Sequence, residues 1–251
     1  MATKPKISLV GAGPGDPDLI TVKGLKILQS ADVVLYDALA NEALLSHAPA
    51  HALKVFVGKR SGKQSMRQDN IESMMVNLAF EKGHVVRLKG GDPYVFGRGH
   101  EELEYIQAFG IEVEVVPGIS SAIAVPASQN IPVTRRDISE SFWVVTATTK
   151  KGAFSQDVRL AAASSATVVI LMGLKKLPEI VEAFRQADKM DQPVMIIQNG
   201  TLPDERCVIS TISNIEREVK AQGIGTPAII VVGSVVNLHP SIAHQMQAAA
   251  V

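Results

Sequence analysis

The sequence has few of the residues on which several common classes of protein depend. Cys207 is the only cysteine among 251 residues, which excludes an intramolecular disulfide and a metal cluster built on several cysteines. Aromatic residues make up 4% of the chain, too few for the stacking platforms that bind single-stranded nucleic acid. The 25 basic and 25 acidic residues balance, so no bulk charge favours nucleic acid or a membrane surface.

Long hydrophobic runs are also missing, although 46% of the residues are hydrophobic. No apolar run approaches the ~18 residues that a membrane-spanning helix needs, and residues 1–6 lack the apolar stretch of a signal peptide. The histidines show no metal-ligand spacing apart from His47 and His51, which Pro49 separates. We therefore predict a cytoplasmic protein with no metal, no membrane and no nucleic-acid partner.

Short apolar runs alternate with helical patterns through the first half of the chain. Five runs, each bounded by glycine, proline or aspartate, predict buried strands at 7–10, 33–36, 54–57, 85–88 and 113–116. Patterns typical of helices lie between them, at 22–30, 66–81 and 100–109. Strands and helices that alternate at this spacing predict a parallel sheet covered by helices.

The second half repeats this organisation after a small-residue helix predicted at 120–129. Further strands are predicted at 142–145, 168–171, 194–197 and 228–232, and the alternating run at 207–210 is consistent with an antiparallel strand. We predict an N-terminal α/β domain over 1–117, a connector over 118–140, a C-terminal α/β domain over 141–240 and a tail over 241–251. A single continuous doubly wound sheet is the alternative.

The densest group of glycine, proline and charged residues follows the strand predicted at 85–88. Gly90 and Gly91 allow the backbone to approach a ligand closely, and Pro93 ends the strand. Arg98 then places a rigid guanidinium beside Glu101. We predict a ligand site in this segment, and a glycine-rich turn before a capped helix is the structural alternative.

The loop after the first predicted strand, at 11–17, has three glycines but not the spacing of a dinucleotide-binding motif. Pro14 and Pro17 also remove two N–H groups of the kind that hold a phosphate. Such a loop suits a ligand that carries no phosphate and needs close backbone approach. S-adenosylmethionine is a ligand of this kind.

Polar residues at the ends of two further strands are candidate site residues. Asp37 follows the second predicted strand, and it is a candidate proton acceptor or, equally, the cap of a turn. Residues 54–67 hold five basic residues and no acidic one, which indicates a solvated face or a site for a polyanionic substrate. Arg135 and Arg136 are candidates for the same cationic field.

Taken together, these segments resemble the tetrapyrrole methylase family over most of the chain. The resemblance lies in residues 10–17, 36–37, 58–60, 88–102, 116–121, 131–136, 172–173 and 199–201. It implies two α/βα domains with the cofactor in the cleft between them, and a homodimer. It also implies S-adenosylmethionine-dependent C-methylation of uroporphyrinogen III, by way of precorrin-1 to precorrin-2, in sirohaem and cobalamin biosynthesis. S-adenosylhomocysteine would be the second product.

The resemblance also implies roles for individual residues. The cofactor would contact Pro14, Gly90, Gly91, Asp92, Val95, Ser120, Ser121, Met172, Gly200 and Ala228. Asp37 and Lys59 match positions proposed as proton acceptor and donor. Arg98 and Glu101 match positions for substrate handling and catalysis. The carboxylates of the substrate would face the basic residues Arg60, Lys63, Arg67, Arg135 and Arg136.

One turn departs from the family pattern, and several functions stay open. Where the family usually has a Thr-Gly-His-like turn, residues 146–148 read Thr-Ala-Thr, which leaves Lys150 or Lys151 as alternative contacts for a substrate carboxylate. A later corrin-pathway precorrin methylase shares the fold, as do diphthine synthase and ribosomal RNA ribose methylases, and the segment at 88–102 disfavours these. A nicotinamide-dependent oxidoreductase, which Pro14 and Pro17 disfavour, and a non-catalytic ligand-binding module are the hypotheses from other classes.

Overall fold

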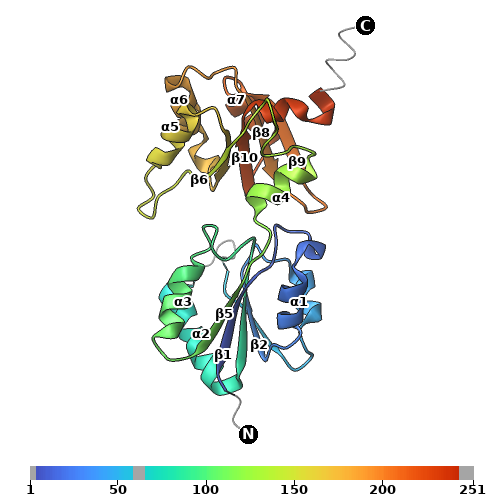
Figure 1. Cartoon of the computed structure of the whole chain (residues 1–251), viewed down its shortest axis with the longest axis vertical. Helices are drawn as coiled ribbons and strands as arrows, with labels where there is room; N and C mark the ends of the chain where they lie inside the picture. The colour runs from blue at the N-terminus through green and yellow to red at the C-terminus, as the bar shows by residue number, and fades with distance from the viewer. Residues whose placement is uncertain (1–3, 59–65, 243–251) are drawn as a thin grey trace. The chain divides into compact units, whose positions relative to one another are not determined.

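The computed structural model describes residues 4–58 and 66–242, and the chain divides into two compact units, Met1–Ser120 and Ser121–Val251. Each unit has its own five-stranded sheet (Figure 1). This agrees with the prediction of two α/β domains, and the alternative of one continuous sheet is wrong. The segment predicted as a connector contains helix α4 (Ser121–Ser128), which packs on strands of the second unit.

The first sheet is parallel, in the order β3-β2-β4-β1-β5. Its strands are β1 (Lys6–Gly11), β2 (Val33–Tyr36), β3 (Leu53–Phe56), β4 (His84–Lys89) and β5 (Glu112–Val116). Each begins and ends within one residue of the apolar run that predicted it. Since all five strands run the same way, their carboxyl ends meet at one edge of the sheet.

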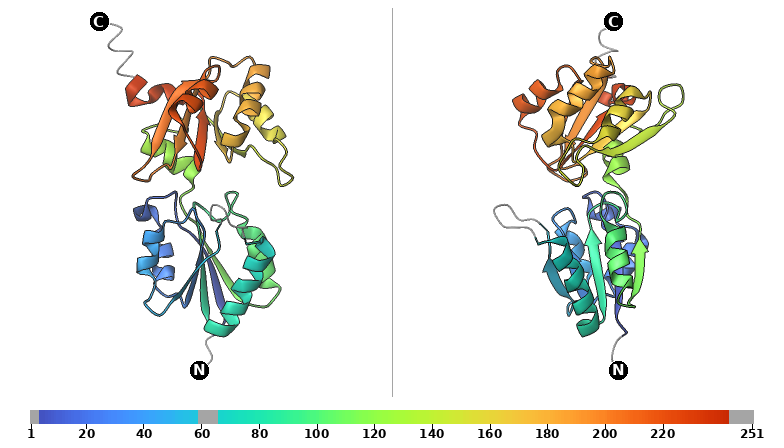
Figure 2. Two further views of the ribbon diagram at one scale, coloured as in Figure 1. Left: turned by 180° about the vertical axis from the view of Figure 1, so that it is seen from behind. Right: turned by 90° about the vertical axis from the view of Figure 1, so that its left-hand side faces the viewer.

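Helices cover both faces of the first sheet. Successive side chains along a strand point to opposite faces, and here the side chains on both faces are buried. Ile7 and Val85 pack against α2 and α3, whereas Val86 belongs to the core on the opposite face, which α1 covers (Figure 2). The same alternation turns Arg87 and Lys89 toward the α2–α3 face. The helical segments are η1 (Pro17–Leu19), α1 (Val22–Leu28), η2 (Glu42–His47), α2 (Gln68–Lys82) and α3 (Gly99–Gln107).

The loop after β1 ends in two capped turns. The Asp16 carboxylate accepts a hydrogen bond from the Asp18 backbone N (2.9 Å), and Pro17 occupies the first position of η1, where no N–H group is needed. The Thr21 hydroxyl oxygen accepts from the Gly24 backbone N (3.0 Å) at the start of α1. Pro17 therefore has a local structural role in addition to the missing donor noted in the sequence.

The second sheet is mixed, in the order β6-β7-β10-β8-β9. Its strands are β6 (Phe142–Thr146), β7 (Thr167–Leu171), β8 (Pro193–Gln198), β9 (Arg206–Thr211) and β10 (Ala228–Val232). Only β6 and β7 pair in parallel among these described strands; β10 runs antiparallel to both β7 and β8. β9 pairs antiparallel with β8, which confirms the interpretation of the alternating run at 207–210.

One large core fills the space between the second sheet and three helices. These helices were not predicted from the sequence. Val168 and Ile170 of β7 pack in this core with Ile180 and Phe184 of α6. Helix α4 lies outside that core and contacts β7 and β10 (Figure 1). The helical segments are α5 (Gln156–Ala163), η3 (Leu174–Lys176), α6 (Leu177–Gln186), α7 (Ile215–Gln222) and η4 (Ser234–Leu238).

His84 opens β4 at the amino edge of the first sheet, away from the carboxyl ends. Its Nε2 atom lies 2.9 Å from the Ser8 hydroxyl and its Nδ1 atom 3.1 Å from the Ser30 carbonyl oxygen. Burial lowers the pKa of His84, although the hydrogen bond to Ser30 opposes this effect. The folded protein therefore favours the neutral imidazole.

Replacing His84 by glutamine is expected to make the free energy of unfolding decrease less at acidic pH. A histidine whose pKa is lowered in the folded state makes its full contribution to the free energy of unfolding above the ordinary histidine pKa of about 6.5. That contribution is lost as the pH falls through the lowered pKa of the folded state. Urea unfolding followed from about pH 7.5 to about pH 4.5 measures this dependence. Equal pH dependence in both proteins would show that His84 does not contribute.

Candidate functional site

Several of the site residues predicted in the first unit lie at the carboxyl edge of its sheet. Asp37 follows β2 directly, and Gly90 and Gly91 follow β4. Pro14 and Gly118 lie in the loops after β1 and β5. These loops are neighbours, because β4 lies between β2 and β1 and because β5 pairs with β1.

Gly11 at the end of β1 and two glycines from the β4 and β5 loops, Gly91 and Gly118, pack backbone against backbone. A Cβ atom on Gly118 would lie 2.7 Å from the Cα atom of Gly11 and closer still to the carbonyl oxygen of Gly91. A Cβ atom on Gly11 would lie 2.7 Å from that same oxygen. Packing therefore requires glycine at Gly11 and Gly118, and Gly91 has a left-handed backbone with φ 67°, which favours glycine by itself. The predicted contact of Gly91 with a ligand stays a prediction.

Several backbone N–H groups of this edge donate to the protein itself. Gly13 N donates to Gly91 O (3.2 Å) and Gly91 N donates to Gly13 O (2.6 Å), which joins the β1 and β4 loops in an isolated antiparallel bridge. Ala12 N donates to Lys89 O (2.7 Å). A phosphate-binding loop directs such groups at its ligand, so this edge suits a ligand without phosphate.

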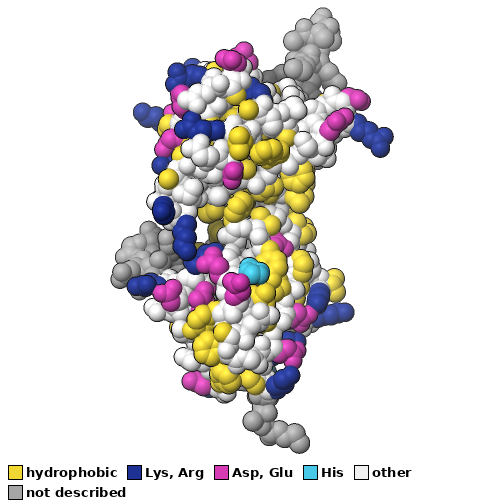
Figure 3. Space-filling view, turned by 60° about the vertical axis from the view of Figure 1, so that its left-hand side comes forward, with side chains coloured by type: hydrophobic (Ala, Val, Ile, Leu, Met, Phe, Trp, Pro, Cys, Tyr) yellow, Lys and Arg dark blue, Asp and Glu magenta, His cyan; other side chains and the backbone are white. Residues whose placement is uncertain are grey.

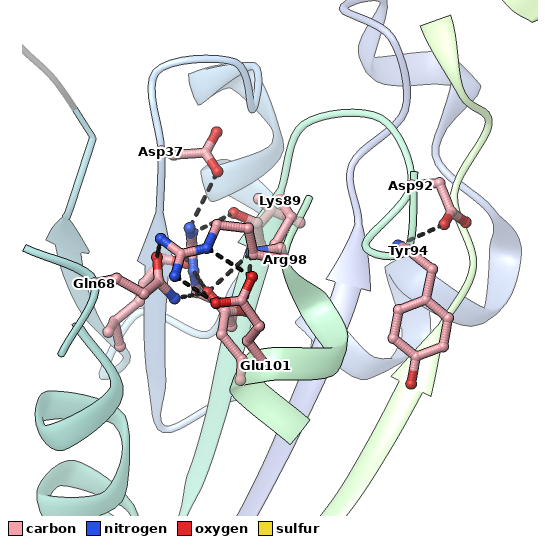
Figure 4. A network of polar contacts seen from close by, with 11 residues as sticks. Asp37, Gln68, Lys89, Asp92, Tyr94, Arg98 and Glu101 are labelled. Atoms are coloured by element: carbon pink, nitrogen blue, oxygen red, sulfur yellow. Dashed lines mark hydrogen bonds and ion pairs between the residues drawn. The ribbon is translucent and has the colours of Figure 1, made fainter. Parts of the chain in front are cut away.

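Asp92 joins the β4 loop to the β5 loop. One of its carboxylate oxygens accepts from Gly118 N (3.0 Å) and the other from Tyr94 N (2.8 Å); Figure 4 shows the second of these bonds. Exposed apolar side chains follow in the same loops and after β2, and they are Leu39, Tyr94, Phe96 and Ile119. The edge thus combines a fixed backbone with apolar surface, as small-molecule sites usually do.

Asp37 both caps a turn and pairs with a buried arginine. Its Oδ1 atom accepts from the backbone N of Leu39 (3.0 Å) and of Ala40 (3.2 Å). Its Oδ2 atom accepts from Nη2 of Arg87 (3.2 Å), and a quarter of the Asp37 side chain is exposed. The turn-cap interpretation is confirmed, and the role of proton acceptor stays a prediction.

Arg87, Lys89 and Glu102 form a buried cluster of charges, and Arg87 connects it to Asp37. Figure 4 shows Lys89 of this cluster near Asp37 and Arg98. Lys89 Nζ donates to both oxygens of Glu102 (2.9 Å each), and Arg87 Nε lies 3.5 Å from Glu102 Oε1. Burial lowers the pKa of Lys89, and the charge of Arg87 lowers it further. This cluster was not predicted from the sequence, although two basic residues two positions apart in a buried strand were the available signal.

Arg98 and Glu101 form a two-point ion pair at the start of α3. Arg98 Nε donates to Glu101 Oε1 (3.0 Å) and Nη2 to Oε2 (2.6 Å), and these hydrogen bonds raise the pKa of Arg98. The backbone of Arg98 is left-handed, with φ 60°, and its side chain is 45% exposed. The guanidinium is therefore fixed in direction and still accessible to a ligand.

Only the two ends of the predicted basic segment, which carry Lys54 and Arg67, belong to the described part of the chain. Lys59, Arg60 and Lys63 lie outside the described residues. Arg67 precedes α2, is exposed and donates to Asp69 (3.1 Å), so part of its charge is balanced locally. Basic and acidic side chains are interspersed on the face of the molecule in Figure 3.

In the second unit, three predicted cofactor contacts lie at one edge of the sheet. Met172 follows β7, Gly200 lies just beyond β8, and Ala228 opens β10 opposite Gln198. The Met172 side chain is 56% exposed. A Cβ atom on Gly200 would collide with Val125 of α4, so packing also requires glycine there.

The turn that departs from the family pattern is a short hairpin in the second unit. Thr148 bridges to Phe154, and Thr149 N donates to Ala153 O (2.9 Å). Lys150 and Lys151 lie exposed in this turn, whereas Ala147 before it is fully buried. Arg135 and Arg136 also belong to this unit and are exposed, so their place in a common cationic field stays a prediction.

Other kinds of site find no support in the part of the chain that the structure describes. It contains no group of three or more metal-ligating side chains and no helix suited to span a bilayer. Burial and the nearby charge of Glu205 raise the pKa of the Cys207 thiol to about 12, which makes it a poor nucleophile at neutral pH.

Comparison with known proteins gives a consistent result. The pattern of the family described as Tetrapyrrole (Corrin/Porphyrin) Methylases matches residues 6–216. The uroporphyrinogen-III C-methyltransferase of Methanocaldococcus jannaschii is 46% identical over 93% of this chain and 97% of that protein. The crystal structure of uroporphyrin-III C-methyltransferase from Thermus thermophilus complexed with S-adenyl homocysteine is 35% identical, covers 93% of this chain and 99% of that chain, and has a TM-score of 0.79.

A second solved structure belongs to a cobalt precorrin-4 methyltransferase, a cobalamin biosynthetic enzyme. It is 29% identical, covers 92% of this chain and 95% of that chain, and has a TM-score of 0.82. The backbone is thus as similar to this enzyme as to the one from Thermus thermophilus, while the sequence is less similar.

Proposed function

The chain belongs to the tetrapyrrole (corrin/porphyrin) methylase family, and we propose that it is the S-adenosylmethionine-dependent enzyme that C-methylates uroporphyrinogen III. Two methyl transfers, by way of precorrin-1, give precorrin-2 for sirohaem and cobalamin biosynthesis. The observation that carries this proposal is the high sequence identity, over nearly the full length of both proteins, to a uroporphyrinogen-III C-methyltransferase.

The carboxyl edge of the first sheet fits the methyl donor. The N–H groups of Gly13, Gly91 and Gly118 are engaged by the protein, so nothing in the junction is arranged for a pyrophosphate. Pro14, Gly90 and Val95 are partly exposed beside it and are accessible to an uncharged adenosine. This favours S-adenosylmethionine over a nicotinamide dinucleotide.

S-adenosylmethionine supplies a methyl group that its sulfonium charge has already activated. The protein then has to align the pyrrole carbon with that methyl group, which can be worth ~7–11 kcal/mol of the barrier. Arg98 suits binding of a substrate carboxylate, because its guanidinium is always charged and is held by Glu101. Asp37 suits the proton acceptor, because Arg87 and two backbone N–H groups fix its carboxylate at the edge.

Product analysis distinguishes this function from that of a later precorrin methylase. We expect the purified protein to transfer two labelled methyl groups from S-adenosylmethionine to uroporphyrinogen III and to give the chromophore of precorrin-2. The similarity in fold to a cobalt precorrin-4 methyltransferase makes a later corrin intermediate the proper competing substrate. Transfer to that substrate alone would contradict the proposal, and no transfer to either would favour a binding module.

We also propose that the enzyme is a cytoplasmic homodimer. Self-association is supported by the edge strand β6, which carries the partly exposed side chains of Phe142 and Trp143, and by Leu160, exposed on the adjacent helix α5. Sedimentation equilibrium measures the mass directly. A mass that stays that of one chain at all concentrations would contradict this part of the proposal.

A further inference from the structure

The Glu102 carboxylate is fully buried and binds groups from two other elements of the first unit. It accepts from Lys89 Nζ of β4 (2.9 Å to each oxygen) and from Gln68 Nε2 of α2 (3.0 Å to Oε1). Arg87 Nε of β4 lies 3.5 Å from the same Oε1 atom. Nothing in the chemistry described above uses this carboxylate, which is the most buried acidic group near the edge.

Stability alone does not explain such a cluster. Moving two or three charges from water into the protein costs free energy, and the attraction between them often does no more than offset this cost. Proteins with apolar residues of similar volume in their place are frequently as stable or more stable. Arg87 even keeps one buried nitrogen, Nε, without a hydrogen bond. In some proteins buried charge is retained because it fixes the geometry of other groups.

The first group fixed in this way is Asp37. Arg87 donates from Nη1 to Leu88 O (3.0 Å) and from Nη2 to Asp37 Oδ2 (3.2 Å), while Glu102 lies against the Nε side of the same guanidinium. Because the guanidinium is planar, these contacts set the position of its donor toward Asp37.

The second group is Arg98, which is reached through Gln68. The Gln68 amide donates from Nε2 to Glu102 and accepts at Oε1 from Arg98 Nη1 (3.4 Å) (Figure 4). Glu102 accepts hydrogen bonds only, so it determines which end of the Gln68 amide faces Arg98. An oxygen at that end attracts the guanidinium, whereas the opposite orientation would place a donor against it.

From these contacts we propose that Glu102 is the anchor of two positioning residues, Arg87 for Asp37 and Gln68 for Arg98. The single carboxylate thereby holds the proton acceptor and the carboxylate-binding group at a fixed separation on the carboxyl edge. This inference rests on the proposed function, which assigns those roles to Asp37 and Arg98. Neither Arg87 nor Gln68 needs to touch the substrate.

Two double-mutant cycles test the two links through which Glu102 acts, from Gln68 to Arg98 and from Arg87 to Asp37. Gln68→Met keeps the length of a partly exposed side chain and removes the amide, and Arg87→Lys keeps the charge and removes the planar fork. Each is expected to lower kcat for methyl transfer by up to about 100-fold, with the affinity for S-adenosylhomocysteine measured by calorimetry unchanged. Gln107→Met, at the exposed end of α3, is the matched control and is expected to have wild-type kcat.

The cycles separate positioning from a general structural role. If Gln68 acts through Arg98, Gln68→Met has little further effect in an Arg98→Ala background, and Arg87→Lys has little further effect in an Asp37→Asn background. The proposal would be overturned if each substitution lowered kcat by the same factor in its mutant background as in the wild-type protein. Wild-type kcat in both single variants would also overturn it. Should Arg87→Lys fail to fold, the Gln68 cycle decides alone. A wild-type protein that cannot methylate uroporphyrinogen III would instead refute the proposed function, and this inference with it.

Discussion

Replacing Arg98 by alanine is expected to lower the rate of methyl transfer by about 100-fold or more. Arg98 combines an accessible guanidinium with a direction fixed by Glu101 and Gln68, so it is the best-placed cation among the described residues of the edge for a substrate carboxylate. Its contacts do not include the glycine junction of the β1, β4 and β5 loops. The affinity for S-adenosylhomocysteine should therefore stay close to that of the wild type.

Turnover with labelled methyl donor and calorimetry with S-adenosylhomocysteine measure the two halves of this prediction. Arg159→Ala is the matched control, because Arg159 is also an exposed helical arginine that donates to a glutamine, Gln186, in the second unit. Full activity of the Arg98 variant would show that the carboxylate-binding role is wrong. Loss of product affinity would show instead that Arg98 holds the cofactor.

Replacing Gly118 by alanine is expected to destabilise the protein by about 3 kcal/mol. The added methyl group would collide with the backbone of both Gly91 and Gly11, and backbone atoms in three joined loops cannot move aside as a flexible side chain can. The shift would also displace Asp92, which accepts a hydrogen bond from Gly118 N. We therefore expect weaker binding of S-adenosylhomocysteine in whatever fraction stays folded.

Urea unfolding of the Gly118 variant gives the change in the free energy of unfolding. Gly225→Ala is the control, since the nearest atom to its added Cβ is 3.6 Å away in the flexible side chain of Gln198. A Gly118→Ala protein as stable as the Gly225→Ala protein would mean that the three loops are not packed as described.

The strands and the division into two sheets were predictable from sequence, because buried strands are short apolar runs between glycine, proline and aspartate. Helices α5, α6 and α7 were not predicted. Helix α5 is rich in alanine and α7 is mostly charged and polar, so neither shows a wide apolar stripe. Helix α6 does bury Leu177, Ile180 and Phe184 at helical spacing, so its pattern was available in the sequence. The antiparallel direction of β10 was also not predictable, since it depends on which strands become neighbours in space.

The candidate site was predictable in its location and less so in its internal contacts. Motif spacing placed Asp37 and Gly90 at strand ends and Arg98 at the start of the helix after β4, and the parallel sheet brings the strand-end loops together. What motif spacing could not give is the partner of each group. The pairing of Glu102 with Lys89, and the use of Gly91 to receive another loop, depend on tertiary packing between segments far apart in the chain.

A crystal structure of this protein with S-adenosylhomocysteine bound tests the central claim most directly. The claim predicts the nucleoside against the carboxyl edge of the first sheet, in contact with Pro14, Gly90 and Val95, with Asp37 and Arg98 held as they are here. Density for the ligand at any other edge, with the glycine junction free of it, would contradict the account.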